Sequence, residues 1–314
     1  MASPMSETLL ERRAVLPRRS NRQRRDDSRA ALFMLGPNVA LFTVFVAVPI
    51  VGAFALSLFA WNLNGAPAWV GLANYRAMLH DPLVGKSVKN TLYFVAMGVV
   101  PTVFLSLGLA MLINFQFRGA TIVRSLYLVP AAVSLAASAV IWQYIYEPRF
   151  GLLSYVFGKV GITPPREGFL FTPGWALPSL DVVCIWTTLP IGILLYLAAL
   201  QRIPDSVLEA AMLDGAGWFR RVRHVIWPGV GDMTLLVAII SLIAFTASGF
   251  DLVNILTKGQ PIYGTETLIY YIYYTSVVNS EWGYAAALSA LQFVIIVGIL
   301  VVLAGLRRFL MRRP

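Results

Sequence analysis

The feature that most constrains this chain is a series of long apolar stretches separated by short polar segments. Each stretch is close to or longer than the roughly 20 residues that a helix needs to cross a hydrocarbon core about 30 Å thick. Only 13% of the residues are charged, against about 25% in an ordinary soluble domain, so a soluble enzyme is excluded. We therefore predict an all-α, polytopic membrane protein with six transmembrane helices, at Ala31–Ala60, Thr91–Ile113, Leu126–Tyr146, Leu180–Leu200, Met233–Phe250 and Tyr284–Leu306.

Helices are the expected form of these stretches because every backbone N–H and C=O group in lipid needs a partner within the protein. The stretches lack the alternation over about 10 residues that marks a strand of an outer-membrane barrel. Prolines at positions 49, 101, 130 and 190 fall inside them, and proline removes a helical hydrogen bond. We therefore expect kinks at these positions, with neighbouring helices covering the freed carbonyl groups.

The distribution of arginine gives the orientation, because positively charged residues are retained on the cytoplasmic side of a membrane. With both termini in the cytoplasm, 18 of the 25 Lys and Arg residues fall in inside segments and 7 in outside loops. We accordingly predict a multi-pass protein of the bacterial cytoplasmic membrane with cytoplasmic N- and C-termini. The loop between the fourth and fifth spans, at about 201–230, is then cytoplasmic.

The first 30 residues carry eight arginines and few apolar groups, which is typical of a disordered segment. We interpret residues 1–30 as a disordered basic cytoplasmic tail and residues 31–314 as the transmembrane domain. A signal peptide is the alternative, but the following apolar run is about twice the 7–15 residues of a signal sequence and has no convincing cleavage site. The arginines are expected to contact membrane lipid and not nucleic acid.

The residue types that build metal sites and disulfides are scarce. Cys184 is the single cysteine and lies inside an apolar run, and His80 and His224 are far apart in the sequence. A disulfide framework and a metal site are therefore not expected.

The polar segment between the fourth and fifth spans has the pattern of a helix–turn–helix. Ser206 and Glu209 have the spacing of a capping box, in which each side chain bonds the other's backbone amide. Gly215 supplies the left-handed backbone that ends a helix. A second short helix is expected from about Trp218 until Pro228 interrupts it.

One face of the first of these helices is apolar, with Val207, Leu208, Ala211 and Met212 at i, i+1, i+4 and i+5. The small side chains of Ala210 and Ala211 allow another backbone to approach closely. From these residues alone, packing of the stripe on the chain's own spans is favoured over docking in a groove of a partner protein. Both interpretations remain open at this point.

The same segment resembles the EAA loop of permease subunits in binding-protein-dependent ABC importers. The family pattern is Glu-Ala-Ala, a glycine four residues after the last alanine, nine further residues, and then Ile-x-Leu-Pro. Here Glu209-Ala-Ala is followed by Asp214-Gly-Ala and, at the family's spacing, by Val225-Ile-Trp-Pro. Val225 and Trp227 depart from the pattern, whereas the other positions match.

Further pieces resemble the carbohydrate-type branch of these permeases, although Ser154 stands where asparagine is frequent. They are Val70-Gly-Leu-Ala-Asn-Tyr-Arg, Asn90-Thr-Leu-Tyr-Phe, Arg124-Ser-Leu-Tyr-Leu-Val-Pro, Ile141-Trp-Gln-Tyr-Ile-Tyr, Gly151-Leu-Leu-Ser and Trp282-Gly-Tyr-Ala-Ala-Ala-Leu-Ser.

The resemblance implies a five-part transporter in which this chain is a transmembrane permease subunit and not an enzyme. It would move a carbohydrate or related polar organic solute, such as an oligosaccharide, glycerol phosphate or a glycerophosphodiester, into the cytoplasm by alternating access. The implied partners are a second related permease, two cytoplasmic ATPase subunits that bind ATP and Mg, and an extracytoplasmic solute-binding protein. This chain would hold no cofactor. The residues implied to contact the ATPase are Glu209, Ala210, Ala211, Asp214, Gly215 and Pro228.

Two other functions stay open: import of another solute class, and ion-coupled secondary transport. Ion coupling usually needs ionisable residues at membrane depth. Asp181 lies one residue from the outer end of its predicted span, and Asp232 lies at an inner boundary. No inverted repeat is visible either, so transport driven by a partner is favoured.

Polar and aromatic side chains inside the spans are candidates for the solute path. Small hydroxyl residues also pack helices together and bond the preceding turn, which is the ordinary interpretation for each of them. Gln292 is harder to explain this way because an amide in lipid needs partners. The path candidates are Ser134, Ser138, Trp142, Trp186, Ser241 and Gln292, and the other polar positions include Thr187, Thr246 and Ser289.

The outside loops, at about 61–90, 147–179 and 251–283, are expected to form the docking surface for the solute-binding protein. They carry several aromatic residues, including Trp61 and a tyrosine-rich run at 270–274. An aromatic belt at the membrane surface is the alternative, and it is favoured for the tyrosines.

Overall fold

The structure is a computed structural model that describes residues 33–63, 65–114 and 120–311. The predicted tail, residues 1–30, lies outside the described residues. The chain divides into two compact units, residues 1–53 and 54–314, and each is described by itself. In the first unit, the described residues form an apolar helical run with a π-helical turn at Thr43–Ala47, which continues as α2 (Val48–Leu56) across the unit boundary.

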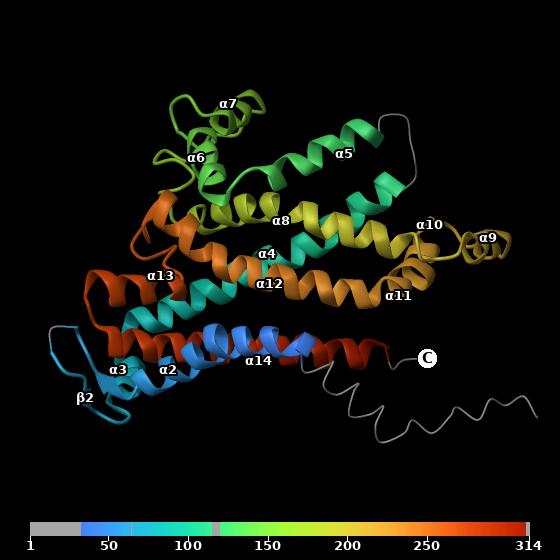
Figure 1. The fold of residues 1–314 in the computed structure, drawn as a ribbon. Helices are drawn as coiled ribbons and strands as arrows, with labels where there is room; N and C mark the ends of the chain where they lie inside the picture. The colour runs from blue at the N-terminus through green and yellow to red at the C-terminus, as the bar shows by residue number, and fades with distance from the viewer. Residues whose placement is uncertain (1–32, 64, 115–119, 312–314) are drawn as a thin grey trace, which may run out of the picture. The chain divides into compact units, whose positions relative to one another are not determined.

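The second unit consists mainly of helices (Figure 1). Its two short strands, β1 (Phe59–Ala60) and β2 (Ala68–Trp69), pair antiparallel with Phe59 opposite Trp69. The helices are α3 (Ala73–His80), α4 (Pro82–Asn114), α5 (Ala120–Leu128), α6 (Leu135–Ile145), α7 (Leu152–Lys159), α8 (Ala176–Leu200), α9 (Asp205–Leu213), α10 (Trp218–Arg221), α11 (Trp227–Gly229), α12 (Gly231–Leu252), α13 (Leu268–Tyr273) and α14 (Trp282–Met311). A 3₁₀ turn lies at Val129–Ala132, and π-helical turns lie at Val222–Ile226, Val253–Thr257 and Tyr274–Val278.

The prediction of a polytopic helical protein is confirmed. Among the described residues, five helices are long and apolar enough to cross a membrane, and a bent pair gives a sixth span if it is counted as one. Four of these helices are longer than the predicted spans, because polar residues such as Lys86 continue the helical backbone beyond the apolar stretch. The first ends at Leu56 and not at the predicted Ala60, which lies in β1. The five helices are Phe33–Leu56, Pro82–Asn114, Ala176–Leu200, Gly231–Thr257 and Trp282–Arg307.

The third span is not the continuous helix predicted for Leu126–Tyr146. Its two parts, Ser125–Ala132 and Leu135–Ile145, meet at an angle of 112°. Ser134 is extended (φ −64°, ψ 151°), and its Oγ accepts a hydrogen bond from the Ala137 amide at 3.3 Å, which starts a new helix. By contrast, α4 and α8 continue as single helices through their prolines. The span therefore breaks where a proline, Pro130, is followed closely by a serine that caps a new helix.

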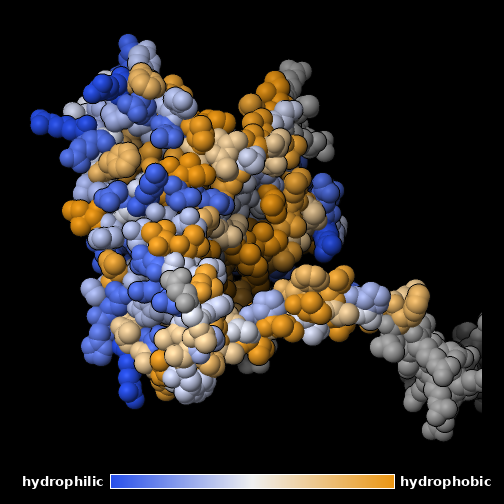
Figure 2. Space-filling model, turned by 60° about the vertical axis from the view of Figure 1, so that its left-hand side comes forward, coloured by the Kyte–Doolittle hydropathy of each residue, from blue (hydrophilic) through white to orange (hydrophobic). Residues whose placement is uncertain are grey.

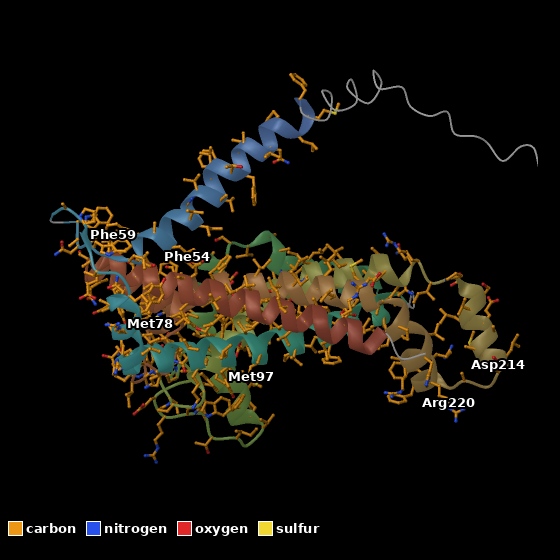
Figure 3. All side chains as sticks on the ribbon, turned by 90° about the horizontal axis from the view of Figure 1, so that it is seen from below. Phe54, Phe59, Met78, Met97, Asp214 and Arg220 are labelled. Atoms are coloured by element: carbon orange, nitrogen blue, oxygen red, sulfur yellow. The ribbon has the colours of Figure 1, made fainter. Side chains whose placement is uncertain are left out.

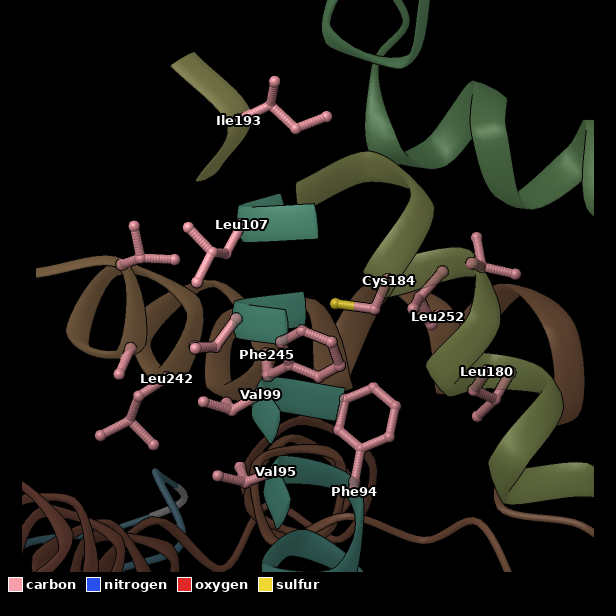
Figure 4. Close-up of a cluster of buried hydrophobic side chains, with 14 of the residues drawn as sticks. Phe94, Val95, Val99, Leu107, Leu180, Cys184, Ile193, Leu242, Phe245 and Leu252 are labelled. Carbon is pink, nitrogen blue, oxygen red and sulfur yellow. The ribbon is translucent and has the colours of Figure 1, made fainter. Parts of the chain in front are cut away.

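The core of the second unit lies where α4, α8 and α12 meet (Figures 1 and 4). The rings of Phe94 on α4 and Phe245 on α12 lie 5.3 Å apart between centroids, and both are fully buried. Gly98 lies under the Phe245 ring, and a Cβ added there would be only 1.7 Å from Phe245 Cε1. On α8, a Cβ at Gly192 would lie 2.3 Å from the Ser106 Oγ. Small residues thus let these helices approach closely, as is usual in membrane bundles.

The two ends of the second unit differ. The α9–α11 segment lies at one end, whereas α3, the strands and α13 lie at the other (Figures 1 and 3). Hydrophilic side chains gather over the end that holds α3 and α13, and apolar ones cover much of the helical flanks (Figure 2). An ion pair between Asp232 and Arg307 joins the start of α12 to the last turns of α14. The end of α14 therefore lies on the same side of the bundle as α9–α11.

Candidate functional site

The segment 203–230 forms the helical hairpin that the sequence predicts, but its start differs. The backbone of Pro204 is extended (φ −62°, ψ 134°), so α9 begins at Asp205, whose carboxyl lies in the first turn. No side-chain hydrogen bond caps this end. The predicted capping box is therefore wrong, because Ser206 already lies inside the helix and cannot act as its N-cap. The acidic first turn is favourable for a different reason, its interaction with the helix dipole.

The end of α9 confirms the role predicted for Gly215. Its φ is +72°, the left-handed region. The Ala216 amide donates to the Ala211 carbonyl at 2.9 Å, and the Gly215 amide donates to the Met212 carbonyl at 3.0 Å. This is the Schellman arrangement, which satisfies the last carbonyl groups of the helix. A Cβ at Gly215 would meet no atom within 4 Å, so only the backbone angle demands glycine here.

The second half of the hairpin matches the second short helix that the sequence predicts. After α10, the chain passes through the π-helical turn Val222–Ile226 and remains helical to Gly229. The helical run ends at Gly229, one residue after Pro228, as predicted. The Val230 amide still donates to the Ile226 carbonyl at 2.9 Å. The hairpin therefore runs into α12 with only Val230 between them.

The apolar stripe of α9 is divided between two environments. Leu208 packs against the hydrophobic core, and Ala211 is half-buried. The other apolar side chains are exposed, with Leu213 at 89% and Phe219 at 70%. We refer to the exposed apolar side chains of Met212, Leu213, Trp218 and Phe219 together as the hairpin patch. Self-packing thus accounts for one side of the hairpin and leaves the patch uncovered.

The charged residues of the hairpin point away from the bundle. Glu209, Ala210 and Asp214 are exposed, and Asp214 and Arg220 project at the end of the molecule opposite Phe59 (Figure 3). Within the described part of the chain, the carboxylates of Glu209 and Asp214 have no hydrogen-bond or ion-pair partner. Pro228 is also exposed. These groups are therefore available to another molecule.

The candidate path residues of the bent third span have separate roles. Ser134 caps α6, and the hydroxyl of Ser138 donates to the Ser134 carbonyl at 3.0 Å, so both serines stabilise the bend. The ring of Trp142 meets that of Trp186 on α8 edge to face, with centroids 5.8 Å apart. The structure thus brings the two predicted tryptophans together.

The remaining polar residues of the spans fall into two groups. Thr187, Thr246 and Ser289 donate to the carbonyls of the preceding turn at 2.8–3.0 Å, which confirms the ordinary interpretation for them. Other buried polar atoms have no hydrogen-bond partner among the described residues, and such an atom costs about 1–3 kcal/mol. These include Trp142 Nε1, Ser241 Oγ and Gln292 Oε1.

Comparison with known proteins identifies the family. No protein-family model matches the chain. A probable ABC transporter permease protein of Pyrococcus horikoshii is 30% identical over 263 residues, covering 83% of this chain and 89% of that protein. A sulfoquinovosyl glycerol transport system permease protein of Agrobacterium fabrum is 31% identical over 271 residues, covering 85% and 86%. This chain belongs to the ABC transporter permease family.

The fold of this ABC transporter permease agrees with solved structures. A bacterial ABC transporter involved in the import of the acidic polysaccharide alginate gives a TM-score of 0.75 at 20% identity, covering 93% of this chain and 100% of that one. A bacterial alginate ABC transporter in complex with an alginate pentasaccharide-bound periplasmic protein gives 0.76 at 20% identity, covering 92% and 98%. The family predicted from the Glu209–Pro228 segment is confirmed, and the permease is a multi-pass protein of the cytoplasmic membrane.

Sequence reasoning missed a polar cluster at the other end of the permease. Asp81 Oδ2 accepts hydrogen bonds from the hydroxyls of Tyr271 at 2.5 Å and Tyr284 at 2.8 Å, and Oδ1 accepts one from the Leu83 amide at 2.9 Å. Burial acts to raise the pKa of Asp81, but these hydrogen bonds outweigh it and hold the pKa below its usual value. The pair Asp81-Pro82 is typical of a helix start, and this pattern could have predicted the hydrogen bond between Asp81 and the Leu83 amide. The aromatic-belt interpretation is wrong for Tyr270 and Tyr271, which are buried.

Asp181 also differs from its predicted environment. Because α8 begins at Ala176, Asp181 lies in the second turn and not at the end of the helix. Its side chain is buried, and neither carboxyl oxygen has a hydrogen-bond partner among the described residues. The predicted span began at Leu180, the first residue of the most apolar stretch, so it placed Asp181 near the end of the helix and did not predict its burial.

Proposed function

We propose that this permease is the membrane subunit of an ATP-driven importer for a carbohydrate or related polar organic solute, such as an oligosaccharide, glycerol phosphate or a glycerophosphodiester. The names of similar permeases support this solute class, since one belongs to a sulfoquinovosyl glycerol system and another, from Yersinia pestis, to an sn-glycerol-3-phosphate system. The structural neighbour that serves alginate import supports it as well. In this proposal the solute enters the cytoplasm by alternating access.

The hairpin patch carries the proposal. Four large apolar side chains of the hairpin are exposed, and exposed apolar patches are typical of sites that bind another protein. We infer that the patch docks in a groove of a cytoplasmic ATPase subunit. The free carboxylates of Glu209 and Asp214 would accept charge-assisted hydrogen bonds from basic groups of that subunit. Ala210 is exposed and allows close approach, whereas Ala211 packs inward.

The connections of the hairpin explain how a force on it would reach the spans. The hairpin leaves α8 at Gln201 and returns to the bundle at Gly231, the start of α12. Both helices pack on α4 in the core. Movement of the ATPase would therefore displace two central helices together and shift the balance between inward- and outward-facing states. Gly215 and Pro228 hold the hairpin in shape for this task.

The complete transporter in this proposal has five parts. A second related permease completes the translocation path, and two ATPase subunits bind ATP and Mg and supply the energy. An extracytoplasmic solute-binding protein delivers the solute, as the periplasmic protein in the alginate complex supports. In this assembly the helices of this chain form part of the solute path and move during transport, and the ATPase subunits hydrolyse ATP.

The solute path is proposed to run past the unpartnered polar atoms. Sugars bind through aromatic stacking and hydroxyl hydrogen bonds, and Trp142, Trp186, Ser241 and Gln292 offer both. We expect Gln292→Leu to lower uptake, because the Oε1 atom would no longer accept a solute hydroxyl. Ser289→Ala is the matched control on the same helix, since the Ser289 hydroxyl is already bonded to the Ala285 carbonyl. Undiminished uptake in Gln292→Leu would remove this residue from the path.

The coupling role is tested by two substitutions in the hairpin. Glu209→Lys reverses an exposed charge, and Gly215→Arg places a side chain where φ is +72°. We expect both variants to insert into the membrane normally but to lose solute uptake. Glu167→Lys, which reverses an exposed charge outside the hairpin, is the control for membrane insertion. Normal uptake by both hairpin variants in a correctly assembled transporter would refute the proposal.

One observation favours a second candidate, ion-coupled transport. A buried ionisable residue is what such transporters require, and Asp181 is buried within a span. The chain alone in proteoliposomes should show no uptake under an imposed proton or sodium gradient if ATPases drive it. Uptake that requires the gradient and is lost in Asp181→Asn would favour the second candidate. A ligand screen by thermal shift on the purified solute-binding protein would then separate a carbohydrate solute from other classes.

A further inference from the structure

An open cleft of about 550 Å³ lies at the end of the bundle opposite the hairpin. Its walls come from the segment before β2, from α3, from α13 and from the start of α14, so four parts of the chain meet there. The residues that define its chemistry are Trp61, Asn74, Asp81, Tyr271, Glu281 and Tyr284.

The cleft is negatively charged. Asp81 and Glu281 both line it, and none of the lining residues is basic. The hydrogen bonds that Asp81 accepts hold its pKa below the usual value, although burial opposes this, so Asp81 is ionised at neutral pH. No cation of the described chain forms an ion pair with either carboxylate. The negative charge is therefore not neutralised by any residue that the structure describes.

The hydrogen-bond donors of Trp61, Asn74 and the two tyrosines are already used within the permease. Trp61 Nε1 donates to the Gly65 carbonyl at 3.0 Å. Asn74 Nδ2 donates to the carbonyls of Ser57 at 2.8 Å and Phe59 at 2.9 Å. The two tyrosine hydroxyls donate to Asp81. The groups that remain available among these residues are acceptors: the Glu281 carboxylate, the Asn74 Oδ1 and the tyrosine oxygens.

The two carboxylates and the remaining acceptors therefore favour a ligand that brings a positive charge and hydrogen-bond donors. Ammonium and guanidinium groups have both properties, whereas a neutral sugar would seek donors as well as acceptors. The indole of Trp61 adds an aromatic surface of the kind that attracts cations. A free small cation would leave most of the cleft unfilled, but a side chain carried on a protein loop would occupy it.

We propose that this cleft receives a Lys or Arg side chain of the extracytoplasmic solute-binding protein. This inference rests on the proposed importer function, and it specifies which part of the outside surface holds that partner and by what chemistry. The helices α3 and α13, which contribute to the cleft, lie at the opposite end of the bundle from α9 and α10, as this role requires (Figures 1 and 3).

The first test uses a peptide probe on the full-length permease in nanodiscs. Acetyl-Gly-Arg-Gly-amide should raise the thermal midpoint saturably, and the citrulline analogue, which is nearly isosteric but uncharged, should not. Glu281→Gln should weaken the peptide by about two- to fivefold, as expected for one partly exposed ion pair. Glu167→Gln, an exposed acid outside the cleft, should leave it unchanged. Equal effects of both peptides, or of both variants, would overturn the proposed site.

The second test identifies the source of the cation. With the complete transporter, Glu281→Gln should weaken binding of the solute-binding protein by a similar factor and reduce its dependence on salt. Unchanged binding in this variant would overturn the docking proposal even if the peptide binds. If no solute-binding protein stimulates the wild-type transporter, the importer function itself fails, and the peptide experiment still reports separately on the cleft.

Discussion

The contact between Gly98 and Phe245 gives the sharpest test of how the core is packed. A Cβ at Gly98 would lie 1.7 Å from Cε1 and 2.3 Å from Cδ1 of the Phe245 ring. That ring is fully buried against Phe94, so it cannot move without disturbing the core. Overpacking of this kind costs about 1–3 kcal/mol. Gly98→Ala should therefore destabilise the permease.

Gly108 on the same helix is the matched control, because a Cβ there would meet nothing within 4 Å. Replacing glycine by alanine gains about 1 kcal/mol of helix propensity at either position, so the difference between the two variants isolates the overpacking cost. We expect Gly98→Ala to unfold at a temperature about 2–12 °C below that of Gly108→Ala, taking about 2–4 °C for each kcal/mol.

Cys184 provides the assay. It is the single cysteine and is fully buried in this core, so a thiol-reactive fluorophore reports its exposure during thermal unfolding. Far-UV circular dichroism on the same samples checks that the thiol follows global unfolding. Adding Phe245→Leu to Gly98→Ala should recover about 1–2 kcal/mol relative to the sum of the single effects, since the smaller side chain makes room. Equal midpoints for the two glycine variants, or purely additive effects in the double variant, would refute the reasoning.

Three further predictions concern polar groups. Asp81→Asn should lower stability by about 1–3 kcal/mol at pH 7, because charged hydrogen bonds are lost, and the difference from wild type should shrink below about pH 4 as Asp81 is protonated. Burial raises the pKa of Glu266 to about 7, although Lys86 opposes the shift. Between about pH 4.3 and pH 7, the folded state therefore keeps a proton that the unfolded state has lost. The free energy of unfolding should accordingly fall as the pH rises through this range. Glu266→Gln should remove this fall, and a pH-independent difference in midpoint between pH 5 and pH 8 would contradict it. Ser134→Ala removes the cap of α6 and should cost about 0.5–2 kcal/mol in the same thermal assay, so an unchanged midpoint would argue against the cap.

Local patterns in the sequence predicted local structure well. Hydropathy located the spans, and Gly215 ended α9 as its conformational freedom requires. The sequence-based predictions failed where two local patterns favoured different structures. Ser206 had a suitable spacing for a cap, but the extended backbone of Pro204 had already started the helix. Pro101 and Pro130 look alike in the sequence, yet only the region after Pro130 also holds a capping serine and breaks the span.

Long-range contacts could not be predicted in this way. Tyr271 and Tyr284 lie 190 and 203 positions from Asp81 in the sequence, and no periodicity relates them. Whether a buried polar atom finds a partner also depends on neighbouring helices. Thr246 and Ser241 are both hydroxyl residues of α12, but only the first bonds a carbonyl of its own helix. The list of candidate path residues could therefore be shortened only once the packing was known.

The bend after α5 determines which surroundings that part of the chain tolerates. With 11 residues, α6 is about 16 Å long, roughly half the thickness of the hydrocarbon layer. Its first turn carries amide protons that no earlier turn can bond, and the Ser134 hydroxyl accepts from one of them. Hydrocarbon chains offer nothing to the others. This elbow must accordingly face a neighbouring polypeptide or a water-filled vestibule, and acyl chains are kept away from it.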